Sequence, residues 1–334
     1  MKIIKFLALP LLLLINTSLS QQTDESPELK QASDLTQSGV KLFQERKYDQ
    51  ALSQVKKGLE IRERLLPRDD LRIATSLLYL GDIYIVKRDF ADAKKVLERL
   101  LETQTQKSGP DHVSLAPALD RLAMIHHRQG NARAAEDLYK RALAAREKAY
   151  GVESVQVAES LFALGQFYRS ERDFERSESN LTRSLFTYAK LTGLSSPEFD
   201  RASDEYICLG RESRNPFLFE YLGEIRKQFA PPAPTEIFQT RVLNEGAVSL
   251  PKPKYPMAAI GSRLQGTVVV KVEIDETGKV IRAYDMCKGP QFLSESAVEA
   301  ALKARFTPTI ISGVPVKVKG VIYYNFVAPG FPNR

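Results

Sequence analysis

The residues around four alanines recur in the same register at an interval of 42 residues, and this period constrains the fold more than any other feature. The alanines are Ala32, Ala74, Ala116 and Ala158. Leucine stands three places after each of them, and a small residue stands seven places after each, at Gly39, Gly81, Ala123 and Gly165. Small residues suit positions where two helices approach closely. The pattern therefore predicts helical hairpins that bury their apolar faces only by stacking on their neighbours.

These repeats resemble the tetratricopeptide family, in particular the long variant of kinesin light chains. The resemblance rests on residues 118–151 and on core positions of the second unit, namely Leu80, Gly81, Tyr84, Ala93, Leu97 and Leu100. It covers residues 32–195, with units near 32–73, 74–115, 116–157 and 158–195. It implies an all-α, right-handed solenoid with a concave groove that binds other proteins.

In that family the first helix of each unit lines the groove. The resemblance thereby assigns six residues to this surface, which are Asp82, Asp120, His127, Arg128, Gln166 and Arg169. Their mixed charge favours a polar peptide as the guest. An ordinary solvated helix face explains any one of these residues equally well.

Residues 1–20 are predicted to be a cleavable secretory signal peptide. Lys2 and Lys5 precede an apolar run over residues 6–15, and Ser18 and Ser20 are small residues before the expected cleavage site. The run is shorter than the roughly 20 apolar residues that span a bilayer, so we expect an exported protein; an uncleaved membrane anchor is the alternative. In an oxidising compartment Cys208 and Cys287 could form a disulfide, or they could be two separate buried thiols.

Residues 196–240 lose the repeating side chains and are predicted to be a connecting region. Ser196-Pro197 suggests a break between helices, and residues 217–229 fit one amphipathic capping helix. Residues 230–234 read Ala-Pro-Pro-Ala-Pro, a short stiff linker. A second domain is expected to follow over residues 241–330.

The second domain shows the alternation typical of strands. Residues 266–275 place Val268, Val270, Val272 and Ile274 on one face, with Thr267, Lys271 and Glu273 on the other; Val269 is an exception. We expect further strands over residues 279–286 and 314–327, a helix over 291–306, a short helix after Tyr255-Pro256, and a strand or hairpin within 241–250. This order predicts an α+β chain, a helical solenoid followed by a small antiparallel sheet.

This second domain resembles the C-terminal domain of TonB-like energy transducers. The resemblance is carried by Pro253, Tyr255-Pro256, Ala258-Ala259, Gly266, Asp275, Gly278, Val280, Ala297, Ala300, Phe306, Pro308, Gly313, Val316 and Phe326. It implies a periplasmic domain whose last strand accepts an extended segment of an outer-membrane receptor as an added strand. The implied docking edge is residues 314–325, with Lys317, Lys319, Tyr323 and Asn325 facing outward; lysines that merely keep an exposed edge soluble are an equal alternative. Residues 1–20 and the brief Pro-Ala stretch depart from a membrane-anchored transducer with a long Pro-rich span.

No arrangement of residues indicates catalysis, a metal site or a cofactor. His126 occupies a packing position of the repeat, the cysteines lack metal-ligand spacing, and serine-nucleophile and phosphate-loop motifs are absent from the sequence. The net charge is +7, and residues 235–334 hold 13 basic against 8 acidic residues without a basic stripe, which argues against nucleic acid as a partner. We therefore expect a binding protein of the envelope, with a non-energised assembly scaffold, homodimeric or not, as the first alternative and a true energy transducer as the second.

Overall fold

The computed structural model describes residues 26–215, 217–229, 241–243, 247–262, 264–311 and 313–328. The predicted signal peptide and the predicted Pro-rich linker at 230–234 lie outside the described residues. The α-carbon contacts divide the chain into two compact units, Met1–Glu171 and Arg172–Arg334. Each unit is described by itself.

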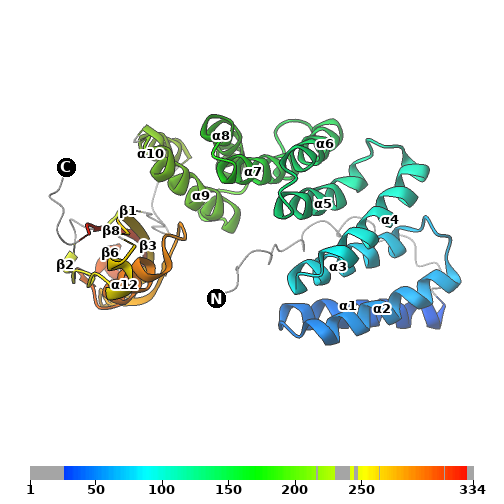
Figure 1. The fold of residues 1–334 in the computed structure, drawn as a ribbon, viewed down its shortest axis with the longest axis horizontal. Coiled ribbons are helices and arrows are strands. Elements are labelled where there is room, and N and C mark those ends of the chain that lie inside the picture. Colours follow the sequence, from blue (N-terminus) through cyan, green and yellow to red (C-terminus); the bar gives the residue numbers. More distant parts are fainter. Residues whose placement is uncertain are drawn as a thin grey trace. The chain divides into compact units, whose positions relative to one another are not determined.

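The first unit consists of antiparallel helical hairpins (Figure 1). Its elements are α1 (Pro27–Gln44), α2 (Tyr48–Leu65), α3 (Leu71–Lys87), α4 (Phe90–Ser108), the 3₁₀ turn η1 (Val113–Leu115), α5 (Ala116–Arg128), α6 (Ala132–Tyr150) and α7 (Val155–Ser170). The predicted small residues lie at the helix crossings: a β-carbon on Gly39 would lie close to Val55, and one on Gly81 would lie close to Leu97. The helical hairpins expected from the 42-residue period are confirmed.

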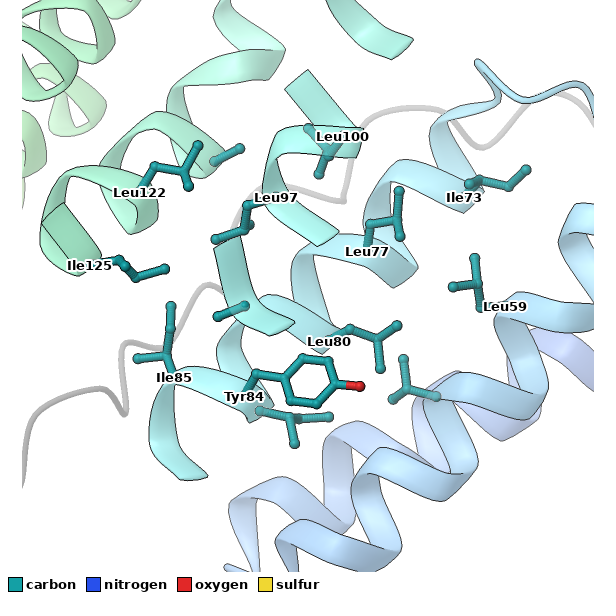
Figure 2. Packing of buried hydrophobic residues seen from close by; sticks show 14 of the residues in the cluster. Leu59, Ile73, Leu77, Leu80, Tyr84, Ile85, Leu97, Leu100, Leu122 and Ile125 are labelled. Carbon is teal, nitrogen blue, oxygen red and sulfur yellow. The ribbon is translucent and has the colours of Figure 1, made fainter. Parts of the chain in front are cut away.

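One apolar cluster joins four successive helices of this unit, α2 to α5. Figure 2 shows Leu59 of α2, Leu77 and Tyr84 of α3, Leu97 of α4 and Ile125 of α5 within it. All five are buried. Because each helix shares this layer with the next, no hairpin has a closed core of its own, and the array gains its stability by stacking.

The second unit begins with three more helices, α8 (Phe174–Leu191), α9 (Pro197–Ser213) and α10 (Phe217–Phe229). The predicted helix over residues 217–229 is observed as α10. Helix α9 was not predicted, because Ser196-Pro197 was interpreted as a break. In fact it starts a helix: the Ser196 hydroxyl accepts a hydrogen bond from the Phe199 amide at 3.1 Å, and Pro197 occupies the first turn.

The turn between the two helices of each hairpin shows that the backbone period extends beyond residue 195. A left-handed residue follows each of α1, α3, α5, α7 and α9, at Arg46, Arg88, Gly130, Arg172 and Arg214, with φ between 57° and 80°. These five residues keep the 42-residue interval, and α9 and α10 form a further hairpin of the same period. The expectation that the repeat register is lost after residue 195 is correct for the side chains and wrong for the backbone.

The C-terminal domain is built on a four-stranded sheet in the order β1-β8-β3-β4. Its strands are β1 (Arg241–Val242), β3 (Gly266–Ile274), β4 (Val280–Asp285) and β8 (Val318–Phe326). Two short ladders accompany it, β2 (Ala247–Ser249) with β5 (Arg305–Phe306), and β6 (Thr309–Ile311) with β7 (Val314–Val316). The expected fold class, a helical solenoid followed by a small domain with antiparallel pairing, is confirmed.

Helices α11 (Met257–Ile260) and α12 (Gln291–Leu302) accompany the sheet. The core contains the predicted inward side chains Val268, Val270, Ile322 and Tyr324, packed with Ala297 of α12. Two expectations about boundaries are wrong. The helix predicted to reach residue 306 ends at Leu302, because Arg305 and Phe306 pair with β2; and the strand predicted over 314–327 is two strands, because β7 turns back onto β6.

Gly278, in the turn from β3 to β4, should be the least replaceable glycine of this domain. Its φ is +83°, and a β-carbon there would lie 1.9 Å from the carbonyl oxygen of Phe306. Gly278→Ala must move the backbone of β5 as well as adopt a left-handed conformation, so we expect a loss of about 2–4 kcal/mol, the strain term being about 1–3 kcal/mol. Urea denaturation followed by circular dichroism measures this loss.

Gly223 in α10 is the matched control, because a β-carbon there would have no neighbour within 4 Å. Gly223→Ala should be neutral or stabilising by up to about 1 kcal/mol. Equal effects of the two substitutions would contradict the steric explanation.

Candidate functional site

Strand β3 is buried on both faces, and this changes the expected surface of the sheet. The predicted outward residue Lys271 is only 2% exposed, and Val269 is fully buried. Val269 breaks the alternation of apolar and polar residues along β3 because its side of the sheet is covered as well. The expectation of a solvated outer face along β3 is therefore wrong.

Helix α9 covers that outer face with four residues spaced along one side of the helix, at Asp200, Asp204, Cys208 and Arg211. The Lys271 ammonium donates to Asp200 Oδ1 at 2.8 Å and to both oxygens of Asp204, at 2.7 and 2.8 Å. The Arg211 guanidinium donates to the carbonyl of Thr267 at 2.7 Å.

A disulfide joins the same two layers. Cys208 of α9 is bonded to Cys287, which follows β4, with 5.3 Å between their α-carbons. The two thiols are therefore one pair rather than two separate buried groups. We call the set Asp200, Asp204, Cys208, Arg211, Lys271 and Cys287 the α9 clamp.

The electrostatics of the clamp centre on Asp204. Burial raises the pKa of this carboxyl to about 6, against the opposing effect of the Lys271 ammonium; Asp200 raises it further and Arg226 of α10 lowers it. For Lys271, burial acts to lower the pKa but Asp204 and Asp200 outweigh it, so its pKa is raised and the ammonium keeps its charge through the acidic range. Burial raises the pKa of Tyr284 of β4, and the charges of Lys271, Asp204 and Asp200 also act on it.

The raised pKa of Asp204 predicts a pH effect of defined sign. Between pH 3.8 and about 6 the folded protein holds a proton that the unfolded chain has released, so the contribution of this carboxyl to stability is lost as the pH rises through about 6. Asp204→Asn should remove that part of the slope. Urea denaturation at pH 4.5 and pH 7 measures it, and parallel profiles for wild type and variant would contradict it.

The predicted docking strand lies inside the sheet over part of its length. β8 pairs with β3 on one side along nine residues, from Val318 to Phe326. On its other side, Gly320 and Val321 pair in parallel with β1, and the Leu243 amide donates to the Val321 carbonyl at 2.9 Å. The expectation that this strand is the open edge of the sheet is wrong at these two residues, because β1 occupies the edge.

The four residues predicted for the docking edge have different surroundings. Lys317 is exposed, between β7 and β8. Lys319 lies 3.7 Å from Asp200 of α9, so it faces the clamp, and Tyr323 is half-buried with its pKa raised by burial. Asn325 is exposed and accepts a hydrogen bond from the Thr267 hydroxyl at 2.5 Å. Asp200 of α9 is thus one acidic partner of Lys319 within this chain.

All six residues predicted for the repeat groove lie on first helices of hairpins, α3, α5 and α7. Asp82 of α3 accepts from Arg121 of α5 at 2.5 and 2.8 Å, which links neighbouring first helices. His127 contacts Glu171 at 3.0 Å and Ser170 at 3.1 Å through Nε2.

Arg128 is exposed at the end of α5, and Gln166 and Arg169 on α7 are half-buried. Asp120 differs, because it turns to Arg146 of α6 at 2.7 Å and burial raises its pKa. Asp120 therefore serves packing between the helices of one hairpin.

Two buried arginines were missed by the sequence analysis. Arg62 of α2 donates to the Ser76 hydroxyl at 2.5 Å and to the carbonyl of Arg72, and Arg146 of α6 donates to Ser160. The two pairs, Arg62 with Ser76 and Arg146 with Ser160, are separated by two repeat lengths. At the intervening place Gln104 donates to the Asp69 carbonyl at 3.0 Å. The signal that could have found them is a polar residue recurring at 42-residue intervals on an otherwise apolar face.

Arg146→Gln should destabilise the repeats by about 2 kcal/mol. It leaves the buried Asp120 without its closest cation, a change that costs about 3–5 kcal/mol in a fully buried pair, and Arg121 lies near enough to compensate in part. The double variant Arg146→Gln/Asp120→Leu copies the neighbouring repeat, which has Gln104 and Leu78, and should recover most of the loss. Urea denaturation measures both variants; equal losses would contradict the pairing.

The described residues contain no group of three or more His, Cys, Asp or Glu side chains that could hold a metal ion. Among the described helices, none combines the length and the hydropathy required to cross a membrane. Two surfaces of the described residues remain candidates for protein contacts. They are the first-helix side of the repeats and the edge of β8.

Comparisons with known proteins likewise separate the repeats from the C-terminal domain. Residues 72–148 and 114–188 match the family model of the tetratricopeptide repeat, and residues 251–327 match that of the Gram-negative bacterial TonB protein C-terminal. A crystal structure described as kinesin light chain nearly identical TPR-like repeats, from Podosopora anserina, is 16% identical with a TM-score of 0.50, covering 60% of this chain and 96% of its own. BtubC (BKLC) from P. vanneervenii is 18% identical with a TM-score of 0.47, covering 66% and 98%. No curated protein gives a significant match.

Proposed function

We propose that this chain, in which tetratricopeptide repeats precede a TonB C-terminal domain, is an adaptor of the cell envelope that binds two proteins. The repeats recruit one partner. The C-terminal domain captures an extended segment of another, such as an outer-membrane transport protein, as an added strand. The adaptor acts in the periplasm after removal of residues 1–20, and binding is its whole activity, without catalysis or a cofactor.

The observation that carries this proposal is the pairing at the outer edge of β8. A strand in parallel orientation lies there, held by the bond from the Leu243 amide to the Val321 carbonyl. The edge of β8 therefore presents its backbone groups in a geometry that a strand can use. Backbone pairing of this kind supplies affinity, and alternate side chains supply selectivity.

The two faces of the sheet direct a guest to the edge. Helix α12 packs on the face that carries Val270 and Ile322, and α9 packs on the face that carries Val269 and Lys271. An incoming segment that bound a face would have to displace a helix. Edge pairing requires no such change.

Asn325 offers a sharp test, since backbone groups alternate along a strand. The Val321 carbonyl points to the β1 side, so the Asn325 amide, four residues further on, points to the same side. Asn325→Pro removes this donor and preserves the ladder with β3, whereas Asn325→Ala removes only the side chain.

We expect wild type and Asn325→Ala to capture an outer-membrane transport protein from envelope extract. Asn325→Pro should fail to capture it. A circular dichroism spectrum equal to that of wild type controls for folding. Capture of the same proteins by all three baits would refute strand addition at β8.

A second candidate, an assembly scaffold, is favoured by the α9 clamp, because the sheet packs on a repeat helix. In a scaffold the two domains form one rigid body or a homodimer, and no extended guest is bound. Size exclusion with light scattering on the purified protein separates the two candidates: a stable homodimer that is lost when the last strand is truncated favours the scaffold. An energy transducer, the third alternative, requires a retained N-terminal anchor, and mature protein that begins at Gln21 would exclude it.

A further inference from the structure

We infer that the repeats hold their partner through arginines at the turns within the hairpins, and that this partner is a protein with isolated surface carboxylates. The residues are Arg46, Arg88, Arg172 and Arg214, and we call them the turn arginines. Their surface serves the recruitment proposed for the repeats, on which the inference rests.

The turn arginines adopt a backbone conformation that disfavours any residue with a β-carbon. Their φ angles lie between 57° and 64°, in the left-handed region where glycine is the usual residue. This conformation lets the following amide close the turn: the Asp89 amide donates to the Tyr84 carbonyl at 2.9 Å, and the Asn131 amide, after Gly130, donates to the His126 carbonyl at 2.9 Å. Because Gly130 satisfies the same geometry, an arginine at the other turns carries a steric cost that the fold does not require.

The side chains of the turn arginines make few contacts within the chain. All four are exposed. In the parts of the chain that the structure describes, the guanidiniums of Arg46, Arg88 and Arg214 form no hydrogen bond or ion pair, and that of Arg172 lies over the Phe174 ring at 5.8 Å. The strained backbone, at the same place in four hairpins, distinguishes them from ordinary exposed cations.

Carboxylates stand beside the turn arginines in the sequence, but other groups engage them. Glu45 binds Lys47 at 2.8 Å, and Asp173 binds Arg176 at 2.6 Å. Asp89 caps the first turn of α4. Among the described residues, each turn arginine therefore remains a positive charge without a carboxylate partner.

This pattern of charges favours a protein over a dense polyanion. A guanidinium binds a carboxylate or a phosphate through two parallel hydrogen bonds. A phosphate polymer or a membrane surface would also bring negative charge against Glu45, Asp89 and Asp173, and such like-charge contacts cost affinity. A protein with single carboxylates contacts the guanidiniums and avoids this repulsion.

Contacts between neighbouring hairpins hold successive turns together. Lys87, beside Arg88, binds Asp49 at the start of α2, three residues after Arg46. Asn215, beside Arg214, donates to Glu178 of α8 at 3.5 Å. The spacing of the hairpins therefore sets the spacing of the carboxylates that a partner must present.

The full chain can be tested with a labelled peptide in which single glutamates alternate with glycine-serine spacers. The glycine variant carries Arg46→Gly, Arg88→Gly, Arg172→Gly and Arg214→Gly. The control variant removes the same charge from exposed helix positions, with Lys57→Gln, Lys95→Gln, Arg141→Gln and Lys148→Gln. A third variant, Gly130→Arg, adds the missing turn arginine.

We expect the peptide to bind the glycine variant about tenfold more weakly than wild type by fluorescence anisotropy, the combined effect of four exposed ion pairs. The control variant should lose less than about twofold, and Gly130→Arg should bind more tightly than wild type. Thermal unfolding should show the glycine variant at least as stable as wild type, because glycine adopts this φ without strain. Equal losses of affinity in the glycine and control variants would overturn the inference. A glycine variant that loses binding to polyphosphate but keeps binding to the peptide would overturn a protein as the partner.

Capture from envelope extract separates the turn arginines from the proposed function. The baits carry Asn325→Pro, which removes strand capture, so a protein that they retain is held elsewhere on the chain. Equal capture of such a protein with and without the four glycine substitutions would overturn the role of the turn arginines and leave recruitment by the repeats standing. No protein captured by Asn325→Pro alone would overturn recruitment by the repeats itself, and the turn arginines with it.

Discussion

Lys271→Ala should destabilise the second unit by about 3–5 kcal/mol, the loss typical of removing one partner from a buried ion pair. Lys271 is 2% exposed, and its ammonium contacts Asp200 and Asp204 at 2.7–2.8 Å. Without it, two carboxylates on successive turns of α9 face an apolar sheet and repel one another. Urea denaturation at pH 7, followed by circular dichroism, should show a lower midpoint for the transition of this unit.

The control separates the lost charge pair from lost volume. Lys271→Met/Asp204→Leu replaces a buried pair with apolar residues of similar size, and such replacements are neutral or stabilising by about 1–4 kcal/mol in other proteins. Asp200 keeps Lys319 as a partner, at 3.7 Å, in this variant. The double variant should be more stable than Lys271→Ala. A loss below about 1 kcal/mol in the single variant would mean that α9 does not hold the sheet through this lysine.

Removing the disulfide between Cys208 and Cys287 should cost about 2–5 kcal/mol, since the bond closes a long loop in the unfolded chain. The sequence separation is 79 residues, and it includes α10 and β3. Cys208→Ala/Cys287→Ala should therefore unfold at a lower urea concentration than wild type. Lys271 and Arg211 still join α9 to the sheet, so we expect the variant to fold.

Reductant supplies the control for this second prediction. Dithiothreitol should lower the stability of wild type to that of the double-alanine variant and leave the variant unchanged. Thiol titration of the unfolded, unreduced protein should find no free thiol. Two titratable thiols under oxidising conditions would contradict the bond.

The sequence predicted much of the fold because the information was local and periodic. The 42-residue interval of Ala32, Ala74, Ala116 and Ala158 indicated the helical repeats directly. The alternation of Val268, Val270 and Val272 indicated one face of β3. These signals depend on neighbours in sequence or on the adjacent repeat. They needed no knowledge of how distant segments meet.

The candidate site was less predictable because it depends on a long-range contact. Asp200, Asp204 and Lys271 look like ordinary surface charges in the sequence, and only the packing of α9 on the sheet buries the lysine. Val269 was the one visible sign of that second covered face. Likewise, nothing local in residues 241–243 indicates a parallel strand, since its partner lies some 80 residues away in β8.

Helix α9 also limits how a gene for such a protein could change in length. A repeat array can gain or lose one whole hairpin at a time, because each hairpin contacts only its neighbours. A change in the number of helices before α9 preserves α9, whereas a copy of α7 in the place of α9 would have Ala158 and Phe162 where Asp200 and Asp204 now contact the sheet. Length variation among descendants of this chain should therefore accumulate on the N-terminal side of α9, with the final hairpin and the sheet inherited together.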